Sequence, residues 1–490
     1  MPELNINFHY VLPPLLMALG GCVVLTEGLV LGARKHTLFF VTTLITAAAS
    51  LGASLCLRGE VGAGFSDAVI IDGTVVLLLS LVAICVILGA LVSPAYLNRY
   101  KMKGADYYTL MLFAACGMQV LVSAGDLSTL FIGLETMSVS VYALTGYRIR
   151  QDASTEGAMK YFLLGAFSSG VFVFGIALTY GATGSTALPE VLAGIADGGS
   201  LGLAGAAMML VGLGFKVAAA PFHMWTPDVY EGAPTVVTAF MSVGAKVGGF
   251  AAMLRVFVSA LPEIGDTWVP AVAVIAALTL LVGNIVAIMQ SNIKRMLAYS
   301  SIAHAGYILI AVAASGQTSE GLSAALFYMF AYLFTNMGAF AVVLAMEHKY
   351  GEGTALNDYA GLAKRHPLMA LAMAYFMLSL TGVPPTGGFS GKFYVFRSAI
   401  EASTLGSDLI WLVIIGVITS VISGYYYLRV VFLMYMTEGD ATLVGERHPA
   451  VVTATAVAVA FTLLLGFMPG AWFDITRQVV LSGAQALVGG

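Results

Sequence analysis

Four lysines fall inside apolar segments of the 490-residue chain, where a charged side chain is costly: Lys160, Lys216, Lys246 and Lys392. A lysine at the centre of a membrane helix costs roughly 2.5–3.5 kcal/mol on insertion scales. Burial favours the neutral amine and a neighbouring carboxylate favours the ammonium form, so a lysine held between these influences exchanges a proton at little cost. Arginine stays protonated and does not exchange in this way. The residue type therefore points to proton transfer.

Two other ionisable residues share this depth. Glu135 stands eight residues into its apolar segment, about 12 Å deep at 1.5 Å per residue. His304 stands in the middle of another apolar segment, and histidine titrates near neutral pH. We expect Glu135 and Lys216 to approach within ion-pair distance, roughly 4 Å or less. The predicted proton-relay residues are Glu135, Lys160, Lys216, Lys246, His304 and Lys392.

Five of these six residues have a structural alternative. Lys160 is only four residues into its segment, so its amine can extend to the interface while its stem stays in lipid. For Lys216, Lys246 and Lys392 the alternative is an ion pair that only holds helices together. For His304 the alternative is a hydrogen bond to a neighbouring helix.

The composition defines the elements that must position these side chains. Hydrophobic residues make up 59% of the sequence and charged residues only 10%. Soluble globular proteins carry about 25% charged residues, so lipid must be the main solvent of this chain. The net charge of −4 and the lack of a basic tract argue against nucleic acid as a partner. The sequence therefore predicts an all-α membrane protein whose partner is the lipid bilayer.

A helix needs about 20 apolar residues to cross a bilayer. Fourteen spans are predicted, at 11–33, 37–57, 74–97, 107–124, 127–147, 157–180, 200–221, 234–260, 268–290, 293–315, 322–346, 367–399, 409–436 and 449–469. Because the loops are short, we expect a single polytopic membrane domain over residues 1–490. Its expected parts are three N-terminal spans (1–106), a first repeat (107–260), a second repeat (268–436), and the last span with a tail (449–490).

The cations between the spans predict the orientation in the membrane. Fourteen Lys and Arg residues follow odd-numbered spans or lie at their inner ends, against four on the opposite side. Lys and Arg concentrate in cytoplasmic loops. This asymmetry predicts that both termini are periplasmic, in a bacterial cytoplasmic (inner) membrane.

Proline and glycine interrupt two of the spans. Pro221 ends the seventh span and Pro384-Pro385 divides the twelfth, in each case near a lysine. Proline removes a helical hydrogen bond, and irregular backbone at membrane depth persists only where protein or a water-filled cavity satisfies it. Either break alone could be a plain kink, but two breaks with nearby lysines favour a polar cavity.

The two breaks occupy matching places in the chain. Spans 4–8 and spans 9–13 each form a unit of five helices, and an odd number inverts the second unit relative to the first. The fourth helix of each unit is broken and carries Lys216 or Lys392, and the second helix carries Glu135 or His304. Inverted repeats with interrupted helices at corresponding positions are typical of transporters. Lys160 and Lys246 have no charged counterpart in the second unit.

The sequence carries no motif for a redox centre. The cysteines Cys22, Cys56, Cys85 and Cys116 form no CxxC pair, and no dinucleotide fingerprint or P-loop stands between a strand and a helix. We expect no metal and no cofactor-binding site in this chain. Redox chemistry linked to this protein would occur in another chain.

Three long motifs resemble one protein family. Three segments are similar to the antiporter-like subunits of respiratory complex I, the proton-pumping NADH:quinone oxidoreductase: the stretch from Phe215 through Lys216 to Val236, the stretch 290–307 around His304, and the broken segment through Lys392. The resemblance covers about spans 4–13, with the motifs in the same order. Lys392 and the expected lack of a long lateral helix after the last span favour the subunit N branch.

The resemblance implies roles for the candidate residues. Glu135 and Lys216 would form the ion pair of a first half-channel, Lys246 would be the central relay, and His304 and Lys392 would lead to the outer side. Lys160 matches a further family lysine. The resemblance also implies partners, namely other membrane subunits, including homologous antiporter-like subunits. NADH, flavin, iron–sulfur clusters and quinone are expected in those partner subunits, and the chain is expected to act as part of the enzyme by translocating protons.

Two other functions share this sequence pattern. A subunit of a multi-subunit cation/proton antiporter or of a membrane-bound hydrogenase would carry the same motifs. A purely structural membrane subunit would use the buried charges only to hold its helices together. Lysine substitutions that destroy assembly and never uncouple transport would favour the structural alternative.

Overall fold

The computed structural model describes residues 7–32, 35–348, 353–439 and 448–488, and the side chains of residues 481–488 are not described. Arg34, Lys349 and Arg447, which contribute to the charge asymmetry, lie outside the described residues. The N-terminal part comprises α1 (Phe8–Leu31), α2 (His36–Cys56), the strands β1 (Gly62–Gly64) and β2 (Val69–Ile71), and α3 (Gly73–Arg99). The two strands pair antiparallel as a short hairpin.

The first repeat begins at α4. It comprises α4 (Gly104–Ser123), α5 (Leu127–Thr145), α6 (Asp152–Thr183), the short α7 (Leu188–Gly194), α8 (Gly199–Lys216), α9 (Thr226–Gly232) and α10 (Thr235–Met253). A π-helical turn (Leu254–Ala260) continues α10, and a 3-10 turn (Pro262–Ile264) leads into the second repeat.

The second repeat begins at α11. It comprises α11 (Gly265–Ile288), α12 (Ile293–Ser315), α13 (Ser319–Met346), a 3-10 turn (Leu356–Tyr359), α14 (Leu362–Arg365), α15 (Pro367–Thr381), α16 (Gly387–Thr404) and α17 (Ile410–Met436). The chain closes with α18 (Pro449–Phe467) and α19 (Pro469–Val488).

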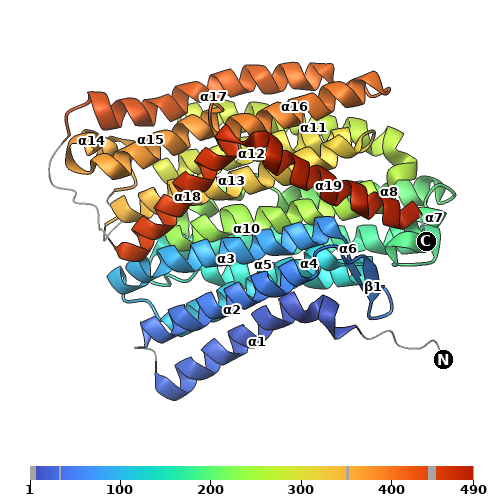
Figure 1. Cartoon of the computed structure of the whole chain (residues 1–490), viewed down its shortest axis with the longest axis horizontal. Coiled ribbons are helices and arrows are strands. Elements are labelled where there is room, and N and C mark those ends of the chain that lie inside the picture. Colours follow the sequence, from blue (N-terminus) through green and yellow to red (C-terminus); the bar gives the residue numbers. More distant parts are fainter. Residues whose placement is uncertain (1–6, 33–34, 349–352, 440–447, 489–490) are drawn as a thin grey trace.

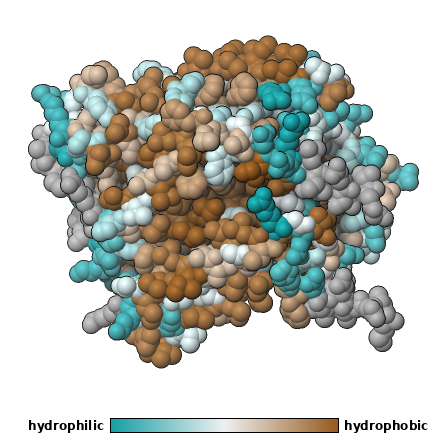
Figure 2. All heavy atoms as spheres, in the orientation of Figure 1, coloured by the Kyte–Doolittle hydropathy of each residue, from teal (hydrophilic) through white to brown (hydrophobic). Residues whose placement is uncertain are grey.

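The predicted membrane architecture is confirmed. Thirteen of the described helices are long and apolar enough to cross a membrane. The consecutive helices α15 and α16 add one further, interrupted crossing (Figure 1). Figure 2 shows apolar residues over the middle of the molecule and polar residues gathered at the two ends of the helices. The start of α1 and the end of α19 lie at the same end of the helices (Figure 1).

The two repeats use the same local device to begin their second helix. Asp126 caps α5 by accepting hydrogen bonds from the backbone of Ser128 and Thr129 at 2.7 and 2.8 Å. Asn292 caps α12 in the same way, accepting from the backbone of Lys294 at 2.9 Å. These side chains satisfy N–H groups that have no partner within the helix. Each capping residue also forms an isolated antiparallel bridge, Asp126 to Ala187 and Asn292 to Ala355.

The centre of the bundle is formed by α10, α12 and α13, whose side chains are almost entirely buried. The packing of α4 on α5 matches that of α11 on α12. Close approach requires glycine at corresponding places: a Cβ on Gly117 of α4 would lie 2.3 Å from the Met137 nitrogen, and one on Gly283 of α11 would lie 2.6 Å from the Ala303 nitrogen. Because the neighbouring atom is backbone in both pairs, a larger residue would push the helices apart.

The tail after the last span is a helix, which the sequence pattern does not reveal. Phe473 of α19 stacks on Tyr394 of α16 with ring centroids 3.7 Å apart. Arg477 pairs with the buried Glu320 at the start of α13, with 2.6 Å between Nε and Oε1. The helix α19 therefore ties the ends of α13 and α16 together.

Candidate functional site

Lys216 is the last residue of α8, where the first broken span is interrupted. Its side chain is buried, and its Nζ donates a hydrogen bond of 2.6 Å to Ser138 Oγ of α5. The ammonium also lies 5.4 Å and 5.7 Å from the ring centroids of Tyr142 and Tyr161. Aromatic faces attract a cation at this distance. Lys216 is therefore held by a hydroxyl and two rings.

The expected direct ion pair between Glu135 and Lys216 is wrong. No salt bridge joins them, although both lie in the described part of the chain. Glu135 turns toward α6, where Ser169 donates a 2.5 Å hydrogen bond to Oε1. Lys216 bonds to Ser138, about one turn further along α5. In this structure each of the two residues therefore bonds a serine and not the other.

A small cavity lies beside this pair. Ser168 and Ser169 of α6, Gly212 and Lys216 of α8, and Tyr142 of α5 contribute to its lining. It has room for about one water molecule. A serine bonded to Glu135 and the amine of Lys216 thus face the same space, which permits contact between them through water.

Lys246 stands at the middle of α10 and is buried. Its Nζ donates to the backbone carbonyl oxygen of Ser301 in α12. The ring centroid of Tyr332 lies 5.7 Å from the ammonium. Gly249 lies nearly one turn beyond Lys246 in α10. A Cβ on this glycine would lie 3.5 Å from the stem of Lys216, so the glycine leaves room for that side chain. The stem of Lys216 therefore packs against α10, the helix that carries Lys246.

His304 connects three helices of the second repeat. Its Nδ1 lies 2.6 Å from the hydroxyl of Tyr328 in α13, and its Nε2 lies 3.1 Å from the hydroxyl of Tyr427 in α17. The structural alternative of interhelical hydrogen bonding therefore describes its present contacts. Tyr427 continues the network to Ser300, its neighbour on α12.

Lys392 lies in α16, beyond the second break, and its amine reaches back to the end of α15. It donates to the carbonyls of Leu380 and Thr381 at 3.1 and 2.9 Å and to Ser420 Oγ at 2.8 Å. The last carbonyls of a helix have no partner within it and carry partial negative charge. A cation at this helix end is stabilised, so the broken span itself supplies the binding place for Lys392.

The structural ion-pair alternative does not describe these three lysines. Within the described residues, no carboxylate forms a salt bridge with Lys216, Lys246 or Lys392. Hydroxyls, carbonyls and aromatic rings hold each amine instead. Loss of a proton from any of these amines would therefore not break an ion pair with a carboxylate of the described residues.

Lys160 stands apart from the buried row, and the expectation that it is buried is wrong. Its side chain is 41% exposed and pairs with Glu156 and Asp228, each at 2.7 Å. Arg295 of α12 also binds Asp228, at 2.7 Å. Lys160 is near the start of α6, so its amine reaches the polar end of the bundle. The structural alternative, in which the amine of Lys160 extends to the membrane interface, describes this lysine better.

Two buried charges were not expected from the sequence, which places both at the ends of spans. Lys294, in the first turn of α12, is buried and donates to the carbonyls of Glu231 and Ala233 at 2.8 and 2.7 Å. Glu347 is buried at the end of α13, 3.7 Å from Arg148. The helix cap at Asn292 could have indicated the burial of Lys294, because it places Lys294 inside a helix and that helix packs against α9.

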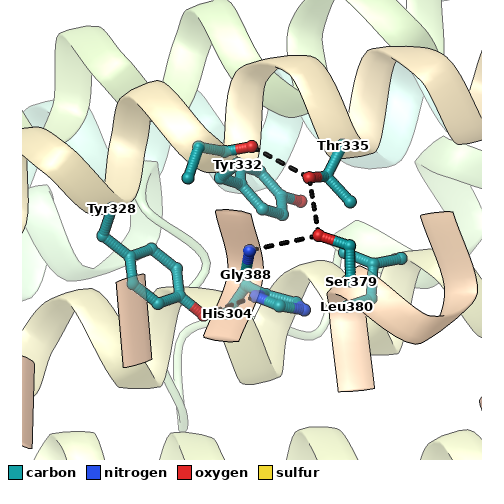
Figure 3. Close-up of a pocket in the computed structure, with 8 residues that line it drawn as sticks. His304, Tyr328, Tyr332, Thr335, Ser379, Leu380 and Gly388 are labelled. Atoms are coloured by element: carbon teal, nitrogen blue, oxygen red, sulfur yellow. Dashed lines mark hydrogen bonds between the residues drawn. The ribbon is translucent and has the colours of Figure 1, made fainter. Parts of the chain in front are cut away.

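A second cavity lies at the break between α15 and α16 (Figure 3). The side chains around it come from α12, α13 and α15, and α16 contributes Gly388. Its lining comprises His304, Tyr328, Ala331, Tyr332, Thr335, Ser379, Leu380 and Gly388. The first cavity is formed by α5, α6 and α8, which are the corresponding helices of the other repeat. Each repeat therefore has a small cavity beside its broken span.

Comparison with known proteins agrees with this architecture. A family described as "NADH:quinone oxidoreductase/Mrp antiporter, TM" matches residues 124–423. The chain is 44% identical over 460 residues to NADH-quinone oxidoreductase subunit N of Chloroflexus aggregans, with 92% of each chain covered. It is similar to a chain of respiratory complex I from Thermus thermophilus, with 34% identity, a TM-score of 0.81, and 94% of this chain and 99% of that chain covered.

A more distant neighbour shares the fold alone. A chain of the Mrp complex from a Dietzia species has a TM-score of 0.83 at 21% identity, with 96% of this chain and 97% of that chain covered. Fourteen crossings, two inverted repeats and broken spans with lysines define a membrane subunit of the antiporter-like class. The chain belongs to the NADH:quinone oxidoreductase/Mrp antiporter family.

Proposed function

We propose that this chain is a proton-translocating membrane subunit of an NADH:quinone oxidoreductase. The observation that carries the proposal is the row of three buried lysines, each held by hydroxyl or carbonyl oxygens and none paired with a carboxylate of the described residues. Such an amine accepts and releases a proton without breaking an ion pair. The subunit N relatives, which match along nearly their whole length, support this assignment over the antiporter alternative.

The relay runs through both repeats. Protons come from the cytoplasmic side near the break after α8 and reach Lys216, opposite Glu135. They pass to Lys246 on the adjacent helix, cross at His304, and leave past Lys392 toward the periplasm. At each step one amine becomes neutral as the next becomes an ammonium. Ordered water bridges groups that do not touch.

Each charge also acts on its neighbours. When one lysine gains a proton, Coulomb repulsion makes a proton on the next lysine less favourable, and this effect is strong where water is excluded. A change in charge at one end of the row is therefore felt along it. This coupling gives a remote redox event a means of driving protons through the chain.

Partner subunits supply the redox chemistry in this proposal. NADH, flavin, iron–sulfur clusters and quinone bind there, and this chain contributes to the enzyme as a translocase. Homologous antiporter-like subunits pack beside it in the bacterial cytoplasmic membrane, with both termini periplasmic. Lys160, at the polar rim with Asp228, has a place near the cytoplasmic inlet and does not belong to the buried row.

Substitution of Lys392 separates translocation from a structural role. Lys392→Met removes the charge, and Lys392→Arg keeps a cation for the carbonyls of Leu380 and Thr381 but does not release its proton. In the assembled complex in inside-out vesicles, we expect both variants to lower NADH-driven proton pumping at least about tenfold, because a positioned proton carrier contributes about 10²–10⁴-fold. Normal pumping by Lys392→Arg with loss in Lys392→Met would contradict the relay and favour the structural role. Mass spectrometry of co-purifying subunits distinguishes the oxidoreductase from an antiporter or hydrogenase.

A further inference from the structure

The central helices α10 and α13 pack antiparallel beside Lys246. Asn336 of α13 donates from Nδ2 to Ser242 Oγ of α10 at 2.7 Å, and the ring centroid of Tyr332 lies 5.7 Å from the Lys246 ammonium. Residues four apart in a helix lie on the same face. Ser242 and Lys246 therefore face Asn336 and Tyr332 as two successive levels of one interface.

Asn336 carries an oxygen that no donor satisfies. Its side chain is 0% exposed, and Oδ1 has no hydrogen-bond partner in the described part of the chain. The hydrogen bonds around it fix the orientation of the amide. Ser242 donates its proton to the carbonyl of Ala239 at 2.9 Å, so it can only accept from Asn336, and Nδ2 must face it. Because a buried acceptor without a donor is costly, Oδ1 requires an explanation.

The ammonium of Lys246 has donors to spare. An ammonium carries three N–H donors, and among the described residues Lys246 bonds one acceptor, the Ser301 carbonyl of α12. Lys392, by comparison, bonds three acceptors at 2.8–3.1 Å. Lys246 is therefore the lysine with unused donors, and the unused acceptor of Asn336 belongs to the helix that packs against it.

The direction of the Lys246 side chain brings donor and acceptor together. Side chains in a helix tilt toward its N-terminus. Ser242 lies four residues nearer the N-terminus of α10, so the stem of Lys246 extends toward the level of Ser242 and of the amide bonded to it. Lysine has a flexible four-carbon stem. Rotation of this stem turns the amine from the Ser301 carbonyl toward Asn336 Oδ1.

We propose that Asn336 is a positioning residue for Lys246, whose ammonium form donates a hydrogen bond to Asn336 Oδ1. The inference rests on the proposed function. A charged donor strengthens a hydrogen bond, so Oδ1 binds the ammonium better than the neutral amine. The amide oxygen is itself neutral, so release of the proton breaks no ion pair with it. Asn336 of α13 and Ser301 of α12 thus hold the charged amine between two helices of the second repeat.

Two variants separate this role from a bond that only joins helices. Asn336→Leu and Ser242→Ala both remove the hydrogen bond between α13 and α10, but only Asn336→Leu removes Oδ1. In the intact complex, we expect Asn336→Leu to lower NADH-driven proton pumping about tenfold, at the low end for a group that serves proton transfer. Ser242→Ala should pump within about twofold of the parent. Equal losses in the two variants, or normal pumping by Asn336→Leu, would overturn the proposal.

A second measurement does not depend on any variant. A density map of the unmodified complex that resolves side chains and ordered water should show the Lys246 amine within about 3.2 Å of Asn336 Oδ1. A map in which Oδ1 bonds only a water or another donor would overturn the proposal. The outcome is separable from that of the proposed function. If Lys392→Met and Lys392→Arg lose pumping while Asn336→Leu does not, the role of Asn336 is wrong and the relay stands. If both lysine variants pump normally, the relay itself is wrong.

Discussion

The two five-helix repeats share the frame that holds their broken spans but differ in where they carry charge. Asp126 and Asn292 cap corresponding helices and form corresponding bridges. The lysines do not correspond in this way: Lys216 precedes its break, whereas Lys392 follows its break. The residue seven positions after Pro221 in the first repeat is Asp228. The residue seven positions after Pro385 in the second repeat is Lys392.

Despite this difference, each lysine lies at the same physical feature. Lys216 is the last residue of α8, and Lys392 places its amine on the last carbonyls of α15. The negative end of a half-helix is where a buried cation is least costly. In both repeats the lysine is therefore associated with a helix end at the break. The lysine can belong to the segment before the break or to the segment after it.

The cavities beside the breaks also differ. In the first repeat the cavity is bordered by Lys216 and by a serine bonded to Glu135. In the second repeat the border is formed by His304 and by hydroxyls, with the lysine amine held behind the Leu380 carbonyl. The first cavity is thus lined by a charged residue, whereas His304 is the one imidazole in the lining of the second and no Lys, Asp or Glu of the described residues lines it.

The largest expected effect tests how tightly each break is packed. A Cβ on Gly388 would lie 1.9 Å from the Ser379 carbonyl oxygen, whereas one on Gly214 would meet only the Phe222 ring, at 2.9 Å. We expect Gly388→Ala to lower the yield of assembled complex at least about fivefold, because overpacking costs about 1–3 kcal/mol or more. Gly214→Ala should lose much less, since a ring can move. Gly170→Ala is the control because nothing lies within 4 Å of its Cβ position. Equal yields for all three variants on native gels would show that the second break is not tightly packed.

The next effect tests the charge pair of the first repeat. Glu135→Gln keeps an oxygen for the bond from Ser169 but removes the negative charge opposite Lys216. We expect coupled proton pumping to fall about tenfold, at the low end for loss of an acid–base group. Glu135→Asp, which retains the charge, should lose less. Full pumping by Glu135→Gln would mean that the first repeat works without its carboxylate, as the second repeat does at His304.

A smaller effect is expected at Asp228, the counterpart of Lys392 in position. Asp228→Asn removes the negative charge that pairs with Lys160 and Arg295, but Glu156 and Glu231 remain as their partners. The thermal stability of the complex should fall by the equivalent of about 1 kcal/mol, as for partly exposed ion pairs. Raising the salt concentration to about 1 M should shrink this difference, because screening weakens the lost pairs. A loss of pumping without a loss of stability would instead assign Asp228 to the relay.

The smallest effect is expected for Lys160. Its amine is exposed at the polar rim, and ion pairs at an exposed surface contribute little energy. We therefore expect Lys160→Ala to change pumping by less than about twofold. Lys216→Met in the same preparation should lose about tenfold, as expected for a proton carrier. If the two variants behaved alike, the separation between rim and buried row would not hold.

The sequence predicts the membrane fold well because lipid imposes a simple pattern. Apolar length and the cost of charge place the fourteen crossings and both breaks. The same reasoning finds Lys246 and Lys392, whose neighbours are apolar. It overestimates Lys160, because a long side chain leaves the apolar layer from inside a span. It misses Lys294, whose amine turns inward to carbonyls of a different helix.

Direct contacts could not be predicted, because they depend on how helices rotate against each other. Glu135 and Lys216 are both deep in their helices, yet each bonds a serine instead of its expected partner. The small cavity at the second break likewise arises only from the way in which α12, α13 and α15 pack. The depth of a side chain in the membrane can be predicted from the sequence, whereas the direction in which it points depends on how the helices pack.

Lys246 provides the most direct test of the account, because it lies between the two repeats and belongs to neither break. Lys246→Met replaces the amine by a neutral side chain of similar length and leaves the Ser301 carbonyl in place. Proton pumping and quinone reduction should be measured together on the assembled complex in vesicles. We predict that the complex assembles normally and that pumping falls at least about tenfold, as for loss of a positioned proton carrier. Full pumping at the parental rate of quinone reduction would contradict the claim that protons cross the chain through its buried lysines.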